Sequence, residues 1–194
     1  MAADTETLWA VIVGAVLATV GGFAATQMEG FLSRRERERS AALLFGEILS
    51  VIELITKLAD DSRGRGDPYG PFTMRLLRSV RREADAYDRN RESLFDLRDG
   101  KVRAQIHALM VRFSLTLEGV FDATAEIAAA ENELKAIGPD DPTKAERLDG
   151  LLETRQSAFD FLVETAAETK PIVATLQKLA KQSFEAYATV VPRP

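Results

Sequence analysis

The sequence predicts an all-α protein in which one N-terminal transmembrane helix continues into an antiparallel, coiled-coil-like four-helix bundle. Three observations lead to this prediction. Residues 7–28 contain no charged side chain. The rest of the chain is rich in Ala, Leu, Glu, Arg and Lys, a composition typical of long helices. Its glycines and prolines cluster at a few points and leave long uninterrupted segments between them.

The predicted transmembrane helix rests on the apolar run 8–25. About 20 apolar residues at about 1.5 Å each cross a hydrocarbon core about 30 Å thick. A cleaved signal peptide would need a basic start and a shorter apolar run, whereas this N-terminus carries Asp4 and Glu6. A buried core helix is the third interpretation. We therefore expect a short extracytoplasmic tail over 1–7, a transmembrane helix over 8–28 and a cytoplasmic helical bundle over 29–194.

The orientation follows from the charges that flank this segment. Arg34, Arg35, Arg37 and Arg39 follow it directly, and no Lys or Arg precedes it. Lys and Arg are retained on the cytoplasmic side, so the N-terminus is expected outside and the bulk of the chain inside. The layout resembles that of many small bacterial membrane proteins, which implies the cytoplasmic (inner) membrane.

Small residues recur at every fourth position of the predicted span, at Ala10, Gly14, Ala18 and Gly22. Residues four apart share a helix face, so they form a ridge that another backbone can approach closely. Ridges of this kind drive helix association in lipid. The ridge predicts self-association, and the alternative is an accidental pattern of common small residues.

Four helical segments are expected after the span, over 34–59, 72–98, 101–137 and 143–190. The loops between them are rich in Gly, Pro and Asp. Pro171 must kink or break the last segment, because proline cannot donate a hydrogen bond to the preceding turn. Short connections between consecutive helices favour an antiparallel bundle.

Apolar residues in the first of these segments recur at heptad spacing, which is typical of a seam packed against other helices. The predicted seam consists of Leu44, Ile48, Val51, Ile55 and Leu58. We favour packing of this seam inside the chain's own bundle, and a second chain is the alternative.

The other segments carry apolar stripes that mark their predicted inner faces. In the second these are Phe72, Leu76, Val80, Ala84, Tyr87, Leu94 and Phe95. In the third they are Val102, Ile106, Leu109, Phe113, Leu117, Val120, Ala123, Ile127 and Leu134, and in the fourth Leu148, Leu152, Phe159, Leu162, Ala166, Val173, Leu176, Ala180 and Phe184.

Helix lengths place a second basic group near the membrane. At about 1.5 Å per residue, the segments 34–59 and 72–98 rise and return by about 40 Å. The turn at Asp99 and Gly100 should therefore lie beside 34–39, which adds Arg98, Lys101 and Arg103 to the membrane-proximal basic residues. Each such side chain near an anionic leaflet contributes about 1 kcal/mol, so contact with anionic lipid is expected.

A further basic group, spaced to share one helix face, consists of Arg75, Arg78, Arg82 and Arg89. Asp85 lies on the same face, so a solvated face with salt bridges is one interpretation. A docking face for an acidic protein partner is the other.

The residue types exclude most catalytic chemistry. The chain has no cysteine and only one histidine, His107, and it lacks a phosphate-binding loop and a metalloprotease motif. A di-iron bundle site needs Glu-x-x-His pairs, but Ala104 stands three residues before His107. We predict no catalytic residue, cofactor or metal, and no small-molecule substrate. A net charge of −5 makes nucleic acid an unsuitable partner.

These observations predict a membrane-anchored, non-enzymatic helical interaction or scaffold protein that self-associates or joins a membrane complex. The alternative is a single-span sensor or effector whose transmembrane helix oligomerises for signalling or pore formation.

Overall fold

The computed structural model describes the backbone of residues 2–137 and 142–184 and the side chains of residues 32–135 and 143–184. The all-α prediction is confirmed over these residues, and the helices pack as a bundle. The elements are α1 (Ala2–Arg63), α2 (Pro71–Arg89), the 3-10 helix η1 (Arg91–Asp96), α3 (Gly100–Ile137), α4 (Pro142–Ala167) and α5 (Thr169–Ala180).

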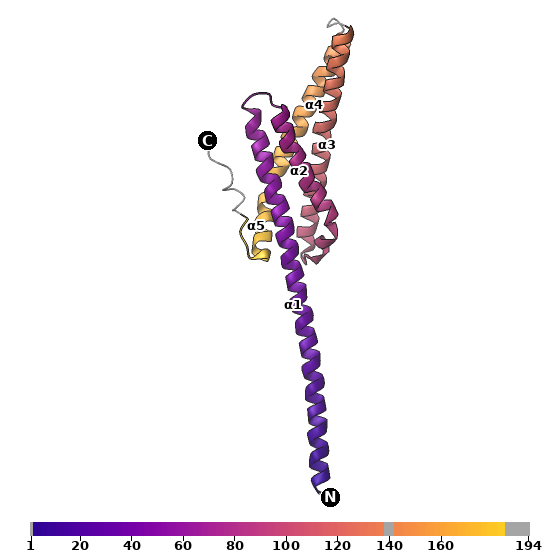
Figure 1. The fold of residues 1–194 in the computed structure, drawn as a ribbon, viewed down its shortest axis with the longest axis vertical. Coiled ribbons are helices and arrows are strands. Elements are labelled where there is room, and N and C mark those ends of the chain that lie inside the picture. Colours follow the sequence, from indigo (N-terminus) through magenta and orange to yellow (C-terminus); the bar gives the residue numbers. More distant parts are fainter. Residues whose placement is uncertain (1, 138–141, 185–194) are drawn as a thin grey trace.

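The long helix α1 organises the molecule (Figure 1). Its C-terminal half packs against α2, α4 and α5, while its N-terminal half extends away from the bundle. At the opposite end, α3 and α4 project together beyond α1 and α2. We call the end from which α1 leaves the bundle the base, which consists of residues 34–39, 91–103 and 178–184. The sequence 33–40, polar and helix-favouring, allows α1 to continue without a break.

The heptad seam of α1 is displaced by one residue from its predicted register. The buried residues recur at the predicted spacing but comprise Phe45, Leu49, Ile52, Thr56 and Ala59. Of the predicted seam only Ile48 is buried, and the other four residues are partly exposed. One residue corresponds to about 100° around a helix. Two adjoining stripes of α1 are apolar, and the positions of α2 and α5 decide which of them faces the core.

The segment expected as one helix over 72–98 is divided. The amide of Asn90 donates to the Tyr87 carbonyl, and the Asn90 side chain donates to the Ala86 carbonyl, so α2 ends there. In the 3-10 helix that follows, residues three apart are eclipsed, which lets Leu94 and Leu97 both be buried. Two predicted inward residues, Phe72 and Phe95, are instead 63% and 78% exposed.

The segment expected over 143–190 forms two helices rather than one. Helix α4 ends at Ala167, and α5 begins at Thr169. The ring of Pro171 clashes with a helical carbonyl four residues earlier, at Ala167, and Pro171 lacks an amide hydrogen. The chain breaks where this clash falls, so the described residues form five α-helices. Helix α5 stops at Lys181, whose left-handed φ of 54° terminates it.

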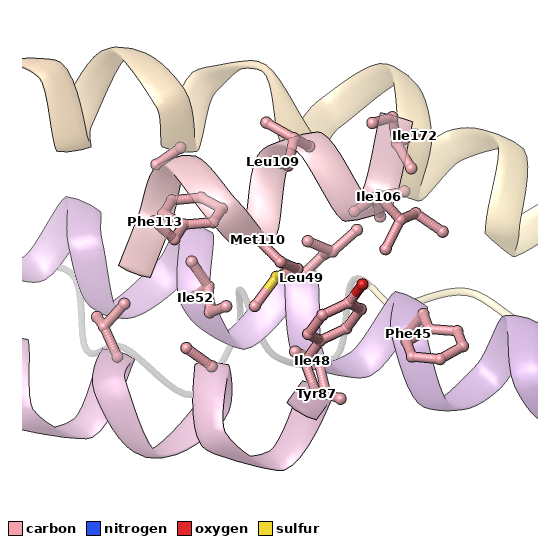
Figure 2. Close-up of a cluster of buried hydrophobic side chains, with 14 of the residues drawn as sticks. Phe45, Ile48, Leu49, Ile52, Tyr87, Ile106, Leu109, Met110, Phe113 and Ile172 are labelled. Carbon is pink, nitrogen blue, oxygen red and sulfur yellow. The ribbon is translucent and has the colours of Figure 1, made fainter. Parts of the chain in front are cut away.

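All five α-helices contribute to the core, and Figure 2 shows the part of it where α1, α2, α3 and α5 meet. Phe45, Leu49 and Ile52 of α1 point toward side chains of the other three helices, among them Phe113 of α3. The Phe45 and Tyr87 rings meet edge to face with centroids 5.8 Å apart, a favourable aromatic geometry. The seam of α1 therefore packs within the chain's own bundle.

The membrane prediction concerns a different part of α1. Within the part of the chain that the structure describes with side chains, no helix holds a stretch long and apolar enough to cross a bilayer. The predicted span 8–28 and its ridge of Ala10, Gly14, Ala18 and Gly22 belong to helix α1, but their side chains lie outside the described residues.

Candidate functional site

An open groove of about 580 Å³ runs between α3 and α4 on the outside of the bundle. It is lined by Leu115, Thr116, Glu153, Thr154, Ser157, Ala158 and Phe161. Leu115 is 62% exposed and Phe161 is 44% exposed. Large apolar side chains grouped on an exposed surface mark interaction sites more often than isolated ones do.

Small residues create this groove. A Cβ atom at Gly119 would lie 3.4 Å from the Cβ of Ala158, so α3 and α4 approach closely at this point. Because only the small residues Gly119 and Ala158 separate the helices at this point, the flanking Leu115 and Phe161 remain on the rim. Val111 lies one turn before Leu115 on the same face of α3 and is also exposed.

An ion pair close to Val111 and Leu115 fixes α3 to the end of α4. The guanidinium of Arg112 donates to both carboxylate oxygens of Glu168, at 3.0 and 2.6 Å. These hydrogen bonds lower the pKa of Glu168 and raise the pKa of Arg112. The two-pronged geometry holds the guanidinium in one orientation, so the position of α4 against α3 is well defined.

A second polar cluster fastens α4 to the end of α1. The Arg63 guanidinium donates to Asp60 and, at 2.7 Å, to Asp160, and lies 4.1 Å from the centre of the Phe159 ring. Gln156 also donates to Asp160 at 3.0 Å. The hydrogen bonds from Arg63 and Gln156 hold the pKa of the Asp160 carboxyl below its ordinary value.

Replacing Asp160 with Asn should remove a pH-dependent part of the stability. A depressed folded pKa means that the unfolded carboxyl binds a proton more readily, so the contribution of Asp160 is present above about pH 4 and is lost as the pH falls through the lowered pKa. Because Asp160 is about half exposed (48%), the contribution near neutrality should be only about 0.2–1 kcal/mol.

Denaturant unfolding of both proteins at several pH values measures this difference. In an Arg63→Met background the Asp160→Asn effect should shrink, because the main partner is gone. An effect of equal size at all pH values would contradict the assignment.

His107 takes part in a local hydrogen-bonded contact. Its Nδ1 lies 3.0 Å from the Tyr87 hydroxyl, and its Nε2 lies 3.4 Å from an Arg91 nitrogen. If Arg91 donates to Nε2, then Nδ1 carries the proton and donates to Tyr87. Both ring nitrogens are thereby used in linking α2, η1 and α3. Burial raises the pKa of Tyr87, so its hydroxyl stays protonated at neutral pH.

The base brings together the two basic groups that the sequence placed near the membrane. The Arg98 side chain pairs with Glu38 at 3.3 Å, and the Arg98 amide donates to the same carboxylate. Arg39 donates to the Ala180 carbonyl at 2.9 Å, which places the end of α5 beside α1. Arg103 donates to the Leu97 carbonyl at 2.6 Å and closes the turn. Arg34, Arg35, Arg37 and Lys101 are exposed.

The arginines predicted to share a face of α2 are exposed at all four positions: Arg75, Arg78, Arg82 and Arg89. Their neighbour Arg81 lies 5.8 Å from the centre of the Phe121 ring of α3. Arg81 therefore faces α3, whereas the four predicted residues lie on the solvent side of α2. Both interpretations of this face, a solvated face and a docking face, agree with that position.

The described residues contain no group of three or more His, Asp or Glu side chains that could hold a metal ion. Sequence reasoning missed the groove, although the spacing of Val111 and Leu115 signals a second apolar stripe on α3 beside the buried one.

Comparison of the chain with protein-family models, curated proteins and solved structures finds no match.

Proposed function

We propose that this protein is a membrane-anchored, non-enzymatic scaffold that self-associates through the groove between α3 and α4. The observation that carries the proposal is the exposed apolar rim of that groove, with Leu115 and Phe161 on its two sides. Burying one such side chain contributes about 1.5–3 kcal/mol, so contact between two of these grooves would contribute substantially to the free energy of association.

A second copy of the chain is the occupant that fits best. Anchored copies stand parallel in one membrane, so their grooves lie at the same height above it. A two-fold axis along the membrane normal then lets Leu115 of one copy meet Phe161 of the other, and the reverse, in a self-complementary interface. The small-residue ridge of Ala10, Gly14, Ala18 and Gly22 supports the same parallel arrangement inside the bilayer.

The alternative function, a sensor or effector whose span oligomerises, draws support from the continuity of α1. One helix of 62 residues contains both the apolar segment and the seam of the bundle core. Rotation or displacement of the span would therefore move the core directly. This function requires the span to carry the association, whereas the scaffold requires the groove to carry it.

Charge substitutions in the groove distinguish these functions. Leu115→Asp should weaken self-association at least about tenfold, because a charge replaces an apolar contact worth more than about 1.4 kcal/mol. Light scattering of the full chain in mild detergent over a range of concentrations measures the change. Phe72→Asp is the matched control, since Phe72 is equally exposed on α2, away from the groove.

The span is tested in parallel by Gly14→Ile with Gly22→Ile. Loss of association in this variant, with Leu115→Asp behaving as wild type, would favour the sensor or effector. A strictly monomeric wild-type chain would refute self-association in either form.

A further inference from the structure

We infer that the base of the bundle is a membrane-docking surface, in which Phe95 inserts into an anionic leaflet beneath a group of basic side chains. The inference rests on the anchor of the proposed function but not on self-association. It concerns how the bundle stands on the membrane, and its occupant is the phospholipid surface itself.

Phe95 has an unusual position for a large apolar side chain. It is 78% exposed and lies in η1, between Leu94 and Leu97, which are both buried. These two leucines fasten η1 to the core, so Phe95 is held outward on a short, well-packed element. An aromatic ring presented in this way matches the interfacial layer of a bilayer, where aromatic side chains are enriched.

The charge of the base differs from that of the whole chain. Its residues comprise Arg34, Arg35, Arg37, Arg39, Arg91, Arg98, Lys101, Arg103, Lys178 and Lys181, against Glu36, Glu38, Glu92, Asp96 and Asp99. The base therefore carries a net charge of +5 in a chain whose net charge is −5. This positive charge attracts the base to an anionic surface.

The dimensions along α1 bring the base within reach of the bilayer. Leu32 is 54% exposed, and Glu29 is the only charged residue between Met28 and Arg34. A hydrocarbon boundary at Leu32 lies six residues, or about 9 Å, before Glu38, which pairs with Arg98 in the turn after η1. The headgroup layer is about 5–8 Å thick, so a side chain projecting from the base can cross it.

A boundary at Leu32 also favours a tilt of α1. The segment below this boundary would then run from Leu8 to Leu32, with Glu29 one turn from its end, and would be about 37 Å long at 1.5 Å per residue. This length exceeds the hydrocarbon thickness of about 30 Å. Such a helix tilts to fit, and tilting lowers one side of the base toward the membrane. The pair between Arg98 and Glu38 fastens the turn after η1 to α1, so the bundle tilts with the helix.

The absence of cysteine from the chain makes a direct test practical. Ala104→Cys, an exposed position in the first turns of α3, accepts one fluorescent label at the base, and Ala129→Cys accepts it on the projecting part of α3. The full chain is reconstituted into vesicles of phosphatidylcholine with one third phosphatidylglycerol that contain a nitroxide-labelled lipid. The label at 104 should be quenched and the label at 129 should not.

Phe95→Ser should lower the docked population at position 104 at least about tenfold, the factor expected for losing one inserted aromatic side chain. Phe72→Ser, at a phenylalanine of similar exposure on the first turn of α2, is the matched control and should leave quenching unchanged. Lys101→Glu should weaken docking, whereas Lys57→Glu, an exposed change outside the base, should not. Vesicles of phosphatidylcholine alone should give weaker quenching.

Two results would overturn the docking surface while leaving the anchor intact. One is equal quenching at 104 with and without Phe95. The other is no quenching at 104 in vesicles that retain the protein after alkaline extraction. Loss of the protein from the vesicles on extraction would overturn the anchor and with it this inference. Neither result depends on whether Leu115→Asp affects self-association.

Discussion

Leu49→Ala is expected to lower the free energy of unfolding by about 2–5 kcal/mol, the range for truncating a buried leucine. Leu49 is almost completely buried in the core where α1, α2 and α3 meet. Leu58→Ala is the matched control, because Leu58 is a partly exposed leucine of the same helix and belongs to the register that the sequence predicted. It should cost about 1 kcal/mol or less.

Denaturant unfolding of the full chain in mild detergent, followed by far-UV circular dichroism, measures both values. A larger loss for Leu58→Ala than for Leu49→Ala would show that the predicted register, and not the observed one, faces the core. Unchanged association of a folded Leu49→Ala protein would agree with a seam that packs inside one chain.

The second large effect is expected at Gly46. Whether Gly46→Ala lowers or raises the free energy of unfolding should depend on Phe184. A Cβ atom at Gly46 would collide with the ring of Phe184, which is buried against α1. Gly46→Ala should therefore displace the ring, at a cost of about 1.5–3 kcal/mol. The higher helix propensity of alanine offsets about 1 kcal/mol of this loss.

In a Phe184→Ala background the collision disappears, and only the higher helix propensity of alanine at position 46 affects the stability. Phe184→Ala by itself should cost about 3–5 kcal/mol, and adding Gly46→Ala should then stabilise the protein by about 1 kcal/mol. The four proteins form a double-mutant cycle that denaturant unfolding can measure. If Gly46→Ala destabilises both backgrounds equally, Phe184 does not occupy the space beside Gly46.

The all-α fold and the inner face of α3 could be predicted because each depends on local pattern. The nine residues predicted for the inner face of 101–137 recur on one side of the helix, and all except the partly exposed Leu134 are buried in the structure. Pro171 likewise breaks the last predicted helix for a reason contained in its own ring. Such features need only the helix period and backbone sterics.

The base is an intermediate case. Helix lengths alone predicted that the turn at Asp99 and Gly100 lies beside 34–39. The contact between Arg98 and Glu38 joins these two segments, as predicted. The exposure of Phe95 was missed because a phenylalanine in an apolar stripe is ordinarily buried. Only the change from α-helix to 3-10 helix after Arg89 turns this residue away from the core.

Local pattern along the chain was enough to predict helices, the loops rich in Gly and Pro between them and the break at Pro171, although not the division after Arg89. It also showed that no cysteine chemistry is available and that positive charge follows the apolar segment. The tertiary structure decided which of two apolar stripes of α1 is buried, that Gly46 receives the ring of Phe184, and that Leu115 and Phe161 border a groove. The physical reason is one of range. Periodicity and sterics act between residues a few positions apart, whereas burial depends on which distant helices arrive and what space their side chains leave.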